Sequence, residues 1–134
     1  MNEPTRAARC SCGQLALTAR GDPVRVSICH CTACQRRTGS VFGAQVRFAA
    51  EAVDIVGAST AYARPADSGH VLTFHFCPRC GSTVYYTNDG LPGFVGVAIG
   101  AFADPDAFEP AHSVYERTRH AWVQVPAAAA RAMD

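Results

Sequence analysis

The sequence predicts a single, mainly β domain. Short segments in which apolar and polar residues alternate recur about every ten residues, and clusters of Gly, Pro, Asn and Asp separate them, which is typical of strands joined by turns. The chain has 134 residues, the usual size of one domain and enough to bury about two-thirds of the surface of the unfolded chain. No internal repeat or linker interrupts this pattern, so we expect one β-rich domain over residues 1–134.

The first half of the chain contains four expected strands. The segment 13–19 alternates leucines with polar neighbours, and a Gly-Asp-Pro turn leads from it into a second alternating segment. The segment 42–48 has an apolar residue at every second position and places Gln45 and Arg47 on its opposite face. We expect these strands at 13–19, 24–28, 42–48 and 53–55.

The second half continues the pattern. A weak strand around Tyr62 precedes a loop at 64–69 that has no apolar pattern, and we expect this loop to be an exposed hairpin tip. Asp-Pro-Asp at 104–106 combines an N-cap residue with proline at the first helical position and predicts a turn of helix. The alanine-rich tail at 124–134 has helix propensity but no packing face, so we expect it to fray. The remaining expected strands are 71–76, 84–87, 94–99 and 112–115.

The chemistry of the chain is concentrated in its seven cysteines. Three of them, Cys29, Cys31 and Cys34, form a C-x-C-x-x-C motif at the end of the second expected strand. Thiolates this close repel one another unless a cation lies between them, and zinc accepts cysteine sulfur in a tetrahedral shell. Three sulfurs leave one position of that shell open, which is typical of a catalytic zinc site.

The other four cysteines form two pairs, Cys10/Cys12 and Cys77/Cys80, and the second pair has the pattern of a zinc knuckle. An odd number of cysteines and the lack of a signal-peptide pattern favour metal binding in the cytoplasm over disulfides. The spacing allows two arrangements. Either the two pairs form a closed four-sulfur site and the central motif holds a second metal, or the last two cysteines of the central motif join the second pair as a zinc ribbon.

Three cysteine-containing segments, in this order and at these separations, carry a family resemblance. They read Cys-Ser-Cys-Gly from Cys10, Cys-His-Cys-Thr-Ala-Cys-Gln-Arg-Arg-Thr-Gly-Ser from Cys29, and Phe-Cys-Pro-Arg-Cys-Gly-Ser from Phe76. Together they resemble the glutathione-dependent formaldehyde-activating enzyme family, which also includes centromere protein V. The likeness covers residues 9 to about 122 and includes the later His112. It implies a β-tent fold, in which small antiparallel sheets are pinned by zinc.

The resemblance also implies two zinc ions per chain and one motif-bearing domain over about 9–123. The structural zinc would be held by Cys10, Cys12, Cys77 and Cys80, and the catalytic zinc by Cys29, Cys31 and Cys34. The chain departs from the family after Trp122, because it lacks the acidic, glycine-containing tail that many members have. In such small folds this tail can lie near the site, so the difference bears on which substrate the protein accepts.

A zinc ion with three thiolate ligands has a net charge of about −1, so it is a weak Lewis acid and a poor activator of water. Such a soft metal favours an incoming thiol, which loses its proton on binding. Cations nearby would stabilise the added negative charge, and Arg36, Arg37 and Arg79 follow or interrupt the ligand motifs. All three are also candidates for binding the carboxylate of a glutathione-like substrate.

Three histidines and one tryptophan require an interpretation. His30 lies between two ligands, so it is a candidate acid–base group or hydrogen-bond donor to the site. A packing or solvent role is the alternative, because neighbouring residues of an extended segment point to opposite sides. We expect structural roles for His75 and His112 and a core position for Trp122.

These patterns predict a zinc-dependent carbon–sulfur lyase or synthase that acts on a thiol adduct of a small aldehyde, of the S-hydroxymethylglutathione type. The alternative is a non-enzymatic zinc-binding protein, a binding or chaperone module with two structural zinc sites. A fourth protein ligand at the three-cysteine motif would favour that alternative. The formal net charge of +1 disfavours nucleic-acid binding, and no apolar stretch approaches the ~20 residues of a membrane span.

Overall fold

The computed structural model describes residues 3–134 and confirms the mainly β fold. The strands form a three-stranded sheet in the order β1-β2-β5 and an eight-stranded sheet in the order β11-β10-β3-β4-β9-β8-β7-β6. The small sheet is antiparallel throughout. Its strands are β1 (Thr5–Arg9), β2 (Ala16–Arg20) and β5 (Val53–Val56).

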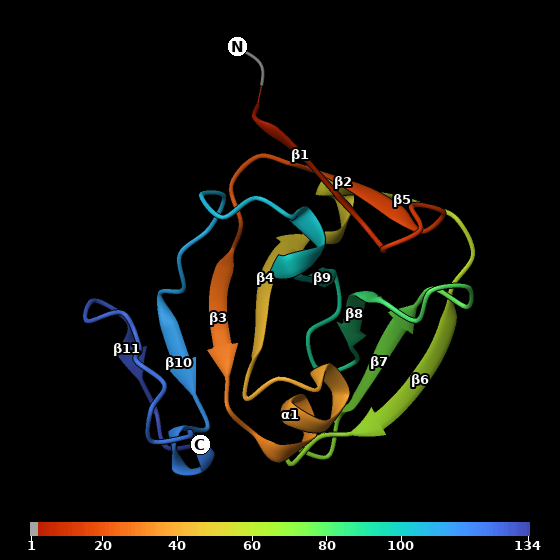
Figure 1. Ribbon diagram of the computed structural model, residues 1–134. Helices are drawn as coiled ribbons and strands as arrows, with labels where there is room; N and C mark the ends of the chain where they lie inside the picture. Colours follow the sequence, from red (N-terminus) through yellow and green to blue (C-terminus); the bar gives the residue numbers. More distant parts are fainter. Residues whose placement is uncertain (1–2) are drawn as a thin grey trace.

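The large sheet is antiparallel except at β10, which runs parallel to both of its neighbours, β3 and β11. Its strands are β3 (Arg25–Cys29), β4 (Gly43–Ala49), β6 (Thr60–Pro65), β7 (Val71–Phe76), β8 (Thr83–Asn88), β9 (Phe94–Ala98), β10 (His112–Val114) and β11 (Ala130–Arg131). In Figure 1, β3 and β4 lie on one side of a short helix, α1 (Thr32–Thr38), and β7 and β6 lie on the other, with β9 and β8 behind. Residues 3–134 also contain three 3-10 helices, η1 (Ala50–Ala52), η2 (Ile99–Phe102) and η3 (Glu116–Thr118). Within residues 3–134 no helix is both long and apolar enough to cross a membrane.

The hydrophobic core lies between the small sheet and one face of the large sheet. Val46 and Phe48 of β4 are fully buried, and they belong to the same cluster as Leu15 and Leu17 beside and within β2. The ring of Phe48 also packs against Phe102, at a centroid distance of 6.5 Å. Each such side chain contributes roughly 1.5–3 kcal/mol when it is fully buried. Because successive side chains of β4 point to opposite faces of the sheet, the residues on its other face do not pack into this core.

The register of the large sheet extends that second face across several strands. Arg47 of β4 lies opposite Gly96 of β9, Gly96 lies opposite Tyr86 of β8, and Tyr86 lies opposite Phe74 of β7. Residues paired in this way point to the same side of a sheet. One continuous face, with polar and aromatic side chains, therefore runs from β4 to β7 on the side away from the core.

The structure differs from the expected elements near the N-terminus. The strand expected at 13–19 is β2 and begins only at Ala16, because the chain turns before it, where the Cys10 N–H donates to the Leu15 carbonyl at 2.9 Å. The alternation pattern does not predict β1, whose one buried side chain is Ala8. An alanine is too small to produce a recognisable apolar pattern, so this strand is visible only through its pairing with β2.

The C-terminal third contains three further differences. Residues 104–106 form a turn and not a turn of helix, because Asp104 Oδ1 accepts a hydrogen bond of 3.0 Å from the Asp106 N–H and closes an Asx turn. Trp122, expected in the core, is 71% exposed. The tail expected to fray over 124–134 instead contains β11, which pairs with β10. The partner of β11 comes from a distant segment, so local composition carries no signal for it.

Candidate functional site

The seven cysteines form two groups, in each of which the sulfur atoms lie within 4.8 Å of one another. One group contains Cys10, Cys12, Cys77 and Cys80, and the other contains Cys29, Cys31 and Cys34. All seven are free thiols. The grouping is the first of the two arrangements that the spacing allows, and residues 3–134 contain no sulfur group that corresponds to a zinc ribbon. Sets of four and three thiols fit zinc, which takes sulfur ligands in a tetrahedral shell.

The four-cysteine group joins the turn before β2 to the β7–β8 hairpin. The Sγ atoms of Cys12 and Cys77 are 3.6 Å apart although the residues are 65 positions apart in the sequence. N–H groups point at the sulfurs: the backbone of Leu15 donates to Cys10 Sγ at 3.4 Å, and the Gln14 side chain donates to Cys77 Sγ at 3.0 Å. Such donors stabilise thiolates, which is the form that a metal requires.

The three-cysteine group is built where β3 passes into α1. Cys29 is the last residue of β3, Cys31 is the N-cap of α1, and Cys34 lies in its first turn. The Sγ atom of Cys31 accepts the Cys34 N–H at 3.2 Å, so a ligand candidate also caps the helix. The helix ends at Gly39, whose φ of 73° closes the C-cap. The helix itself begins at Thr32, within the cysteine motif.

The sulfurs of this group strongly perturb one another. Hydrogen bonds with Cys29 and Cys34 lower the pKa of Cys31, and the positive charge of Arg64 lowers it further. The hydrogen bond to Cys31 raises the pKa of Cys29. For Cys34, the hydrogen bond with Cys29 lowers the pKa, but the hydrogen bond with Cys31 and burial outweigh it, and the charge of Arg37 opposes the net rise. Three thiols this close form an anionic site that attracts a cation.

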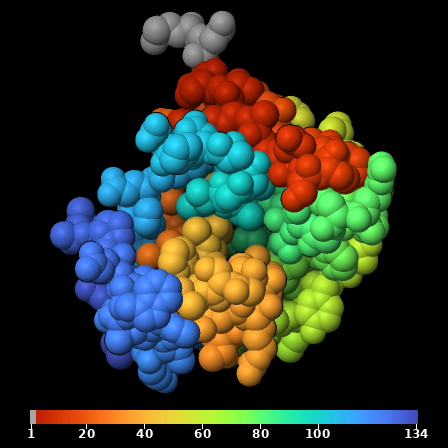
Figure 2. Space-filling view, viewed as in Figure 1, coloured from red at the N-terminus to blue at the C-terminus, as the bar shows by residue number. Residues whose placement is uncertain are grey.

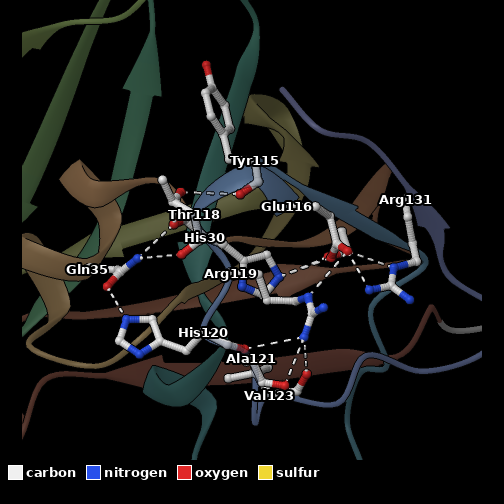
Figure 3. Close-up of polar contacts among 11 residues, drawn as sticks. His30, Gln35, Tyr115, Glu116, Thr118, Arg119, His120, Ala121, Val123 and Arg131 are labelled. Atoms are coloured by element: carbon white, nitrogen blue, oxygen red, sulfur yellow. Dashed lines mark hydrogen bonds and ion pairs between the residues drawn. The ribbon is translucent and has the colours of Figure 1, made fainter.

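The His30 side chain belongs to a buried polar network (Figure 3) and not to the group of three sulfurs. Its ring is fully buried, with Nε2 2.9 Å from Ser113 Oγ and 3.5 Å from the carboxylate of Glu116. Burial lowers the pKa of His30. Its carbonyl oxygen accepts hydrogen bonds from Thr118 Oγ1 at 2.7 Å and from Gln35 Nε2 at 2.9 Å. Contacts of the His30 ring and of the His30 carbonyl oxygen therefore hold the backbone segment that positions Cys29 and Cys31.

Glu116 is the centre of this network, as Figure 3 shows. Its carboxylate accepts hydrogen bonds from the Ser113 hydroxyl and from Arg131 Nε, the latter at 2.8 Å, and Arg119 Nε lies 3.5 Å away. Burial alone would raise its pKa, but the hydrogen bonds from Ser113 and Arg131 outweigh that effect and lower it. A charged carboxylate thus fixes η3 against β10 and β11, and β10 pairs with β3, the strand that ends at Cys29.

A cavity of about 400 Å³ opens over the three-cysteine group and includes all three cysteines in its wall. The rest of the wall comes largely from the polar and aromatic face of the large sheet. Four arginines contribute to it: Arg37, Arg47, Arg64 and Arg117. In Figure 2 the region of α1, in yellow-orange, lies between the C-terminal segment in blue and residues 60–90 in green. The wall also contains two carboxylates, Asp67 and Asp134, and Asp134 pairs with Arg117, so the arginines without a carboxylate partner in this wall are Arg37, Arg47 and Arg64.

The residues singled out in the sequence occupy different places. Arg37 lines the cavity, whereas Arg36 is exposed and lies outside its wall. Arg79 is exposed in the turn between β7 and β8. His75 stacks on the ring of Tyr85 at a centroid distance of 4.4 Å, and His112 lies in β10. The roles of Arg36, Arg37 and His30 toward a substrate remain predictions.

The sequence pattern does not single out several residues of the cavity wall. Arg64 falls in the segment expected to be an exposed loop, but it belongs to β6 and lines the cavity. Tyr86 packs directly on Gly96, where an added Cβ would lie only 2.2 Å from the ring. Burial raises the pKa of Tyr86, so its hydroxyl stays protonated. The one sequence signal for this wall is the polar face of the strand expected at 42–48, where Arg47 points away from the core residues.

Comparisons with known proteins agree with this arrangement. The family model described as glutathione-dependent formaldehyde-activating enzyme matches residues 5–118. Among solved structures, a crystal structure of a Rhodobacter sphaeroides protein has the same fold, with a TM-score of 0.57 and 18% sequence identity over 78% of this chain and 91% of that chain. The search of curated proteins finds no match. Because the family match spans most of the chain, the protein belongs to the glutathione-dependent formaldehyde-activating enzyme family.

Proposed function

We propose that the protein is a zinc-dependent carbon–sulfur lyase or synthase that acts on the adduct of a thiol and a small aldehyde, of the S-hydroxymethylglutathione type. One observation carries this proposal: the group of three thiols opens into a cavity whose wall contains four arginines. Three sulfurs leave one position of a tetrahedral zinc site for a substrate. Arginines are suited to hold the carboxylates of a glutathione-like thiol, since each offers a fork of N–H donors.

The chain's own groups have separate tasks in this proposal. Cys29, Cys31 and Cys34 would hold zinc, which when bound would favour the thiolate form of a substrate sulfur. Arg37 and its neighbours would bind the anionic parts of the thiol and offset the negative charge. The protonated hydroxyl of Tyr86 is available as a hydrogen-bond donor to the oxygen of the hydroxymethyl group.

The reaction needs no oxidant or reductant. In the lyase direction the carbon–sulfur bond of R–S–CH₂–OH breaks, its electron pair stays on sulfur, and the hydroxyl proton leaves as the carbonyl double bond of formaldehyde forms. The products are a thiolate, a proton and formaldehyde, and the synthase direction reverses each change. The positive charge around the sulfur favours the thiolate in both directions.

The alternative hypothesis, a non-enzymatic protein with a second structural zinc site, would need a fourth protein ligand. Within residues 3–134 no histidine or carboxylate joins the three sulfurs, and the His30 ring is instead hydrogen-bonded to Ser113. These contacts support an exchangeable fourth position and thus the enzyme.

The test is exchange NMR with glutathione and ¹³C-formaldehyde. We expect zinc-loaded protein to increase the exchange rate between free formaldehyde and the S-hydroxymethyl adduct above the rate in buffer. The folded Cys34→Ser variant should not increase it. If the unchanged, zinc-loaded protein accelerates exchange with neither glutathione nor other abundant thiols, the proposed function is wrong.

A further inference from the structure

Phe74 lies in the cavity wall under two guanidinium groups. It is 5% exposed and lies within β7, and its ring centroid is 4.7 Å from Arg37 Cζ and 5.2 Å from Arg64 Cζ. Both distances are within the roughly 6 Å range of cation–π contacts. Arg37 comes from the last turns of α1 and Arg64 from β6. One aromatic ring therefore ties together side chains from two elements that border the cavity.

The two stacked arginines also lie near the cysteine group. Both line the same cavity as Cys29, Cys31 and Cys34. Two guanidinium groups on one ring repel each other, and within residues 3–134 neither forms an ion pair with a carboxylate. The pair is balanced by the adjacent sulfurs and is suited to receive a further anion.

Gly43 leaves the space that Arg37 occupies. It lies in β4 without a left-handed φ, so the backbone does not require glycine. A Cβ at this position would be 2.9 Å from Arg37 Nη2, 3.3 Å from Cys34 Cβ and 3.4 Å from Gln45 Oε1. The guanidinium group thus fills the place of the missing side chain, next to a cysteine of the cluster. Arg37 Nε and Gln45 Oε1 are buried without a hydrogen-bond partner among residues 3–134.

We infer that Phe74 is a positioning residue that holds the guanidinium groups of Arg37 and Arg64 beside the three-cysteine group, and that this pair makes the cavity selective for thiols that carry a carboxylate over neutral thiols of similar size. The inference rests on the proposed function, since it concerns thiol binding at the same site. Phe74 itself would touch no reacting atom. Its ring fixes two flexible side chains that would otherwise lose conformational freedom when they bind an anion.

Binding selectivity is the direct test. The two probes are 3-mercaptopropionate and 2-mercaptoethanol, which differ chiefly in the carboxylate, and isothermal titration calorimetry gives the Kd of each for zinc-loaded protein. We expect the unchanged protein to bind the carboxylate thiol about tenfold more tightly, as one charge-assisted contact would produce. Phe74→Leu should reduce this ratio to within about twofold and leave the Kd of 2-mercaptoethanol nearly unchanged, while Phe74→Tyr, which keeps the ring, should preserve the ratio.

A second variant reaches the same arginine by another route. Gly43→Ala should displace the flexible end of Arg37 without removing the ring, and it should lower the ratio in the same direction. Gly100→Ala is the matched control, because nothing lies within 4 Å of a Cβ there and the φ of Gly100 is not left-handed. Phe76→Leu controls for the loss of an aromatic ring from β7 outside the cavity wall. Circular dichroism verifies that each variant is folded.

The outcomes separate this inference from the proposed function. Equal affinities of the two probes for the unchanged protein, no binding of either probe, or an unchanged ratio in folded Phe74→Leu would each overturn the inference. An equal loss of affinity for both probes in Phe74→Leu would also overturn it, because that is the effect of a merely structural residue. Formaldehyde is absent from these titrations, so a protein that shows the expected ratios but does not accelerate exchange would refute the lyase proposal alone.

Discussion

The two cysteine groups use the same ligand atoms in opposite settings. The four-cysteine group connects the small sheet to the hairpin of the large sheet and joins residues 65 positions apart. The three-cysteine group lies within one β3–α1 junction and connects nothing distant, but it opens into a cavity with four arginines. The number of sulfurs and their surroundings, and not the ligand type, separate a site that holds the fold from a site suited to chemistry.

The comparison predicts its largest effect in the four-cysteine group. Closing a chain loop of this length costs roughly 4 kcal/mol, while structural zinc binding yields about 10–16 kcal/mol and a domain is stable by only about 5–15 kcal/mol. Cys80→Ser should therefore give unfolded or insoluble protein. Cys34→Ser should stay folded and bind one zinc ion in place of two. Circular dichroism and metal analysis distinguish the two, and the opposite pattern would reverse the assignment of the sites.

Gradual removal of metal should reveal the same order within one molecule. Zinc bound at the four-cysteine group would be coupled to folding, since an unfolded chain holds no preformed site. Zinc bound at the three-cysteine group would be accessible from the cavity and coupled to little of the fold. A chelator titration should release the first equivalent with an unchanged far-UV circular dichroism spectrum and the second together with unfolding. Simultaneous release of both equivalents with unfolding would contradict this separation.

The contrast between the groups also explains what the sequence could predict. Close spacing identifies the cysteine motifs, and alternation identifies most of the large sheet, including the strand at 42–48 that became β4. Neither spacing nor alternation in the sequence predicts the cavity. Arg64 and Phe74 lie on the two strands of the β6–β7 hairpin, and Arg37 of α1 meets them because β4, which follows α1, pairs with the distant strand β9 of the same sheet. No local pattern records which face of one strand will lie opposite another.

Residues with little side-chain signal illustrate the same limit. β1 is held by pairing around Ala8, and β11 by a parallel partner far away in the sequence. Conversely, a strong local signal at 104–106 produced a turn, because the Asp104 side chain binds the backbone two residues on and no helix continues. Pairing with another strand decided the first two segments, and a hydrogen bond within the turn decided the third, so strand or helix propensity alone describes none of them.

A moderate effect is expected from the network behind the three-cysteine group. Glu116→Gln removes the charge that binds Arg131 and faces Ser113 and His30, and it should lower the free energy of unfolding by about 1–3 kcal/mol at neutral pH, because buried partners lose a charge-assisted bond. Urea unfolding measures this change. No change would mean that the network does not support the cysteine motif.

The same variant should alter the dependence of stability on pH. The pKa of Glu116 is lower in the folded protein than in the unfolded chain, so its contribution is complete above the unfolded value of about 4.3 and is lost as the pH falls through the folded value. The unchanged protein should therefore lose stability more steeply than Glu116→Gln as the pH falls below about 5. Parallel curves would show that another carboxyl group dominates acid unfolding.

The smallest expected effect concerns one charge at the cavity. Arg37→Ala should leave the fold and both zinc ions intact, because Arg37 joins no ion pair within residues 3–134 and lies at the end of α1. It should weaken glutathione binding about tenfold, as the loss of one charge-assisted contact does. Arg20→Ala is the control, since it removes one positive charge from the small sheet, where Arg20 pairs with exposed Asp54. Calorimetry at two salt concentrations should show the difference between the variants shrinking as salt screens the cavity charge. If Arg20→Ala weakened binding as much as Arg37→Ala, general net charge and not the position of Arg37 would explain the affinity, and the contrast between the two cysteine groups would lose its electrostatic basis.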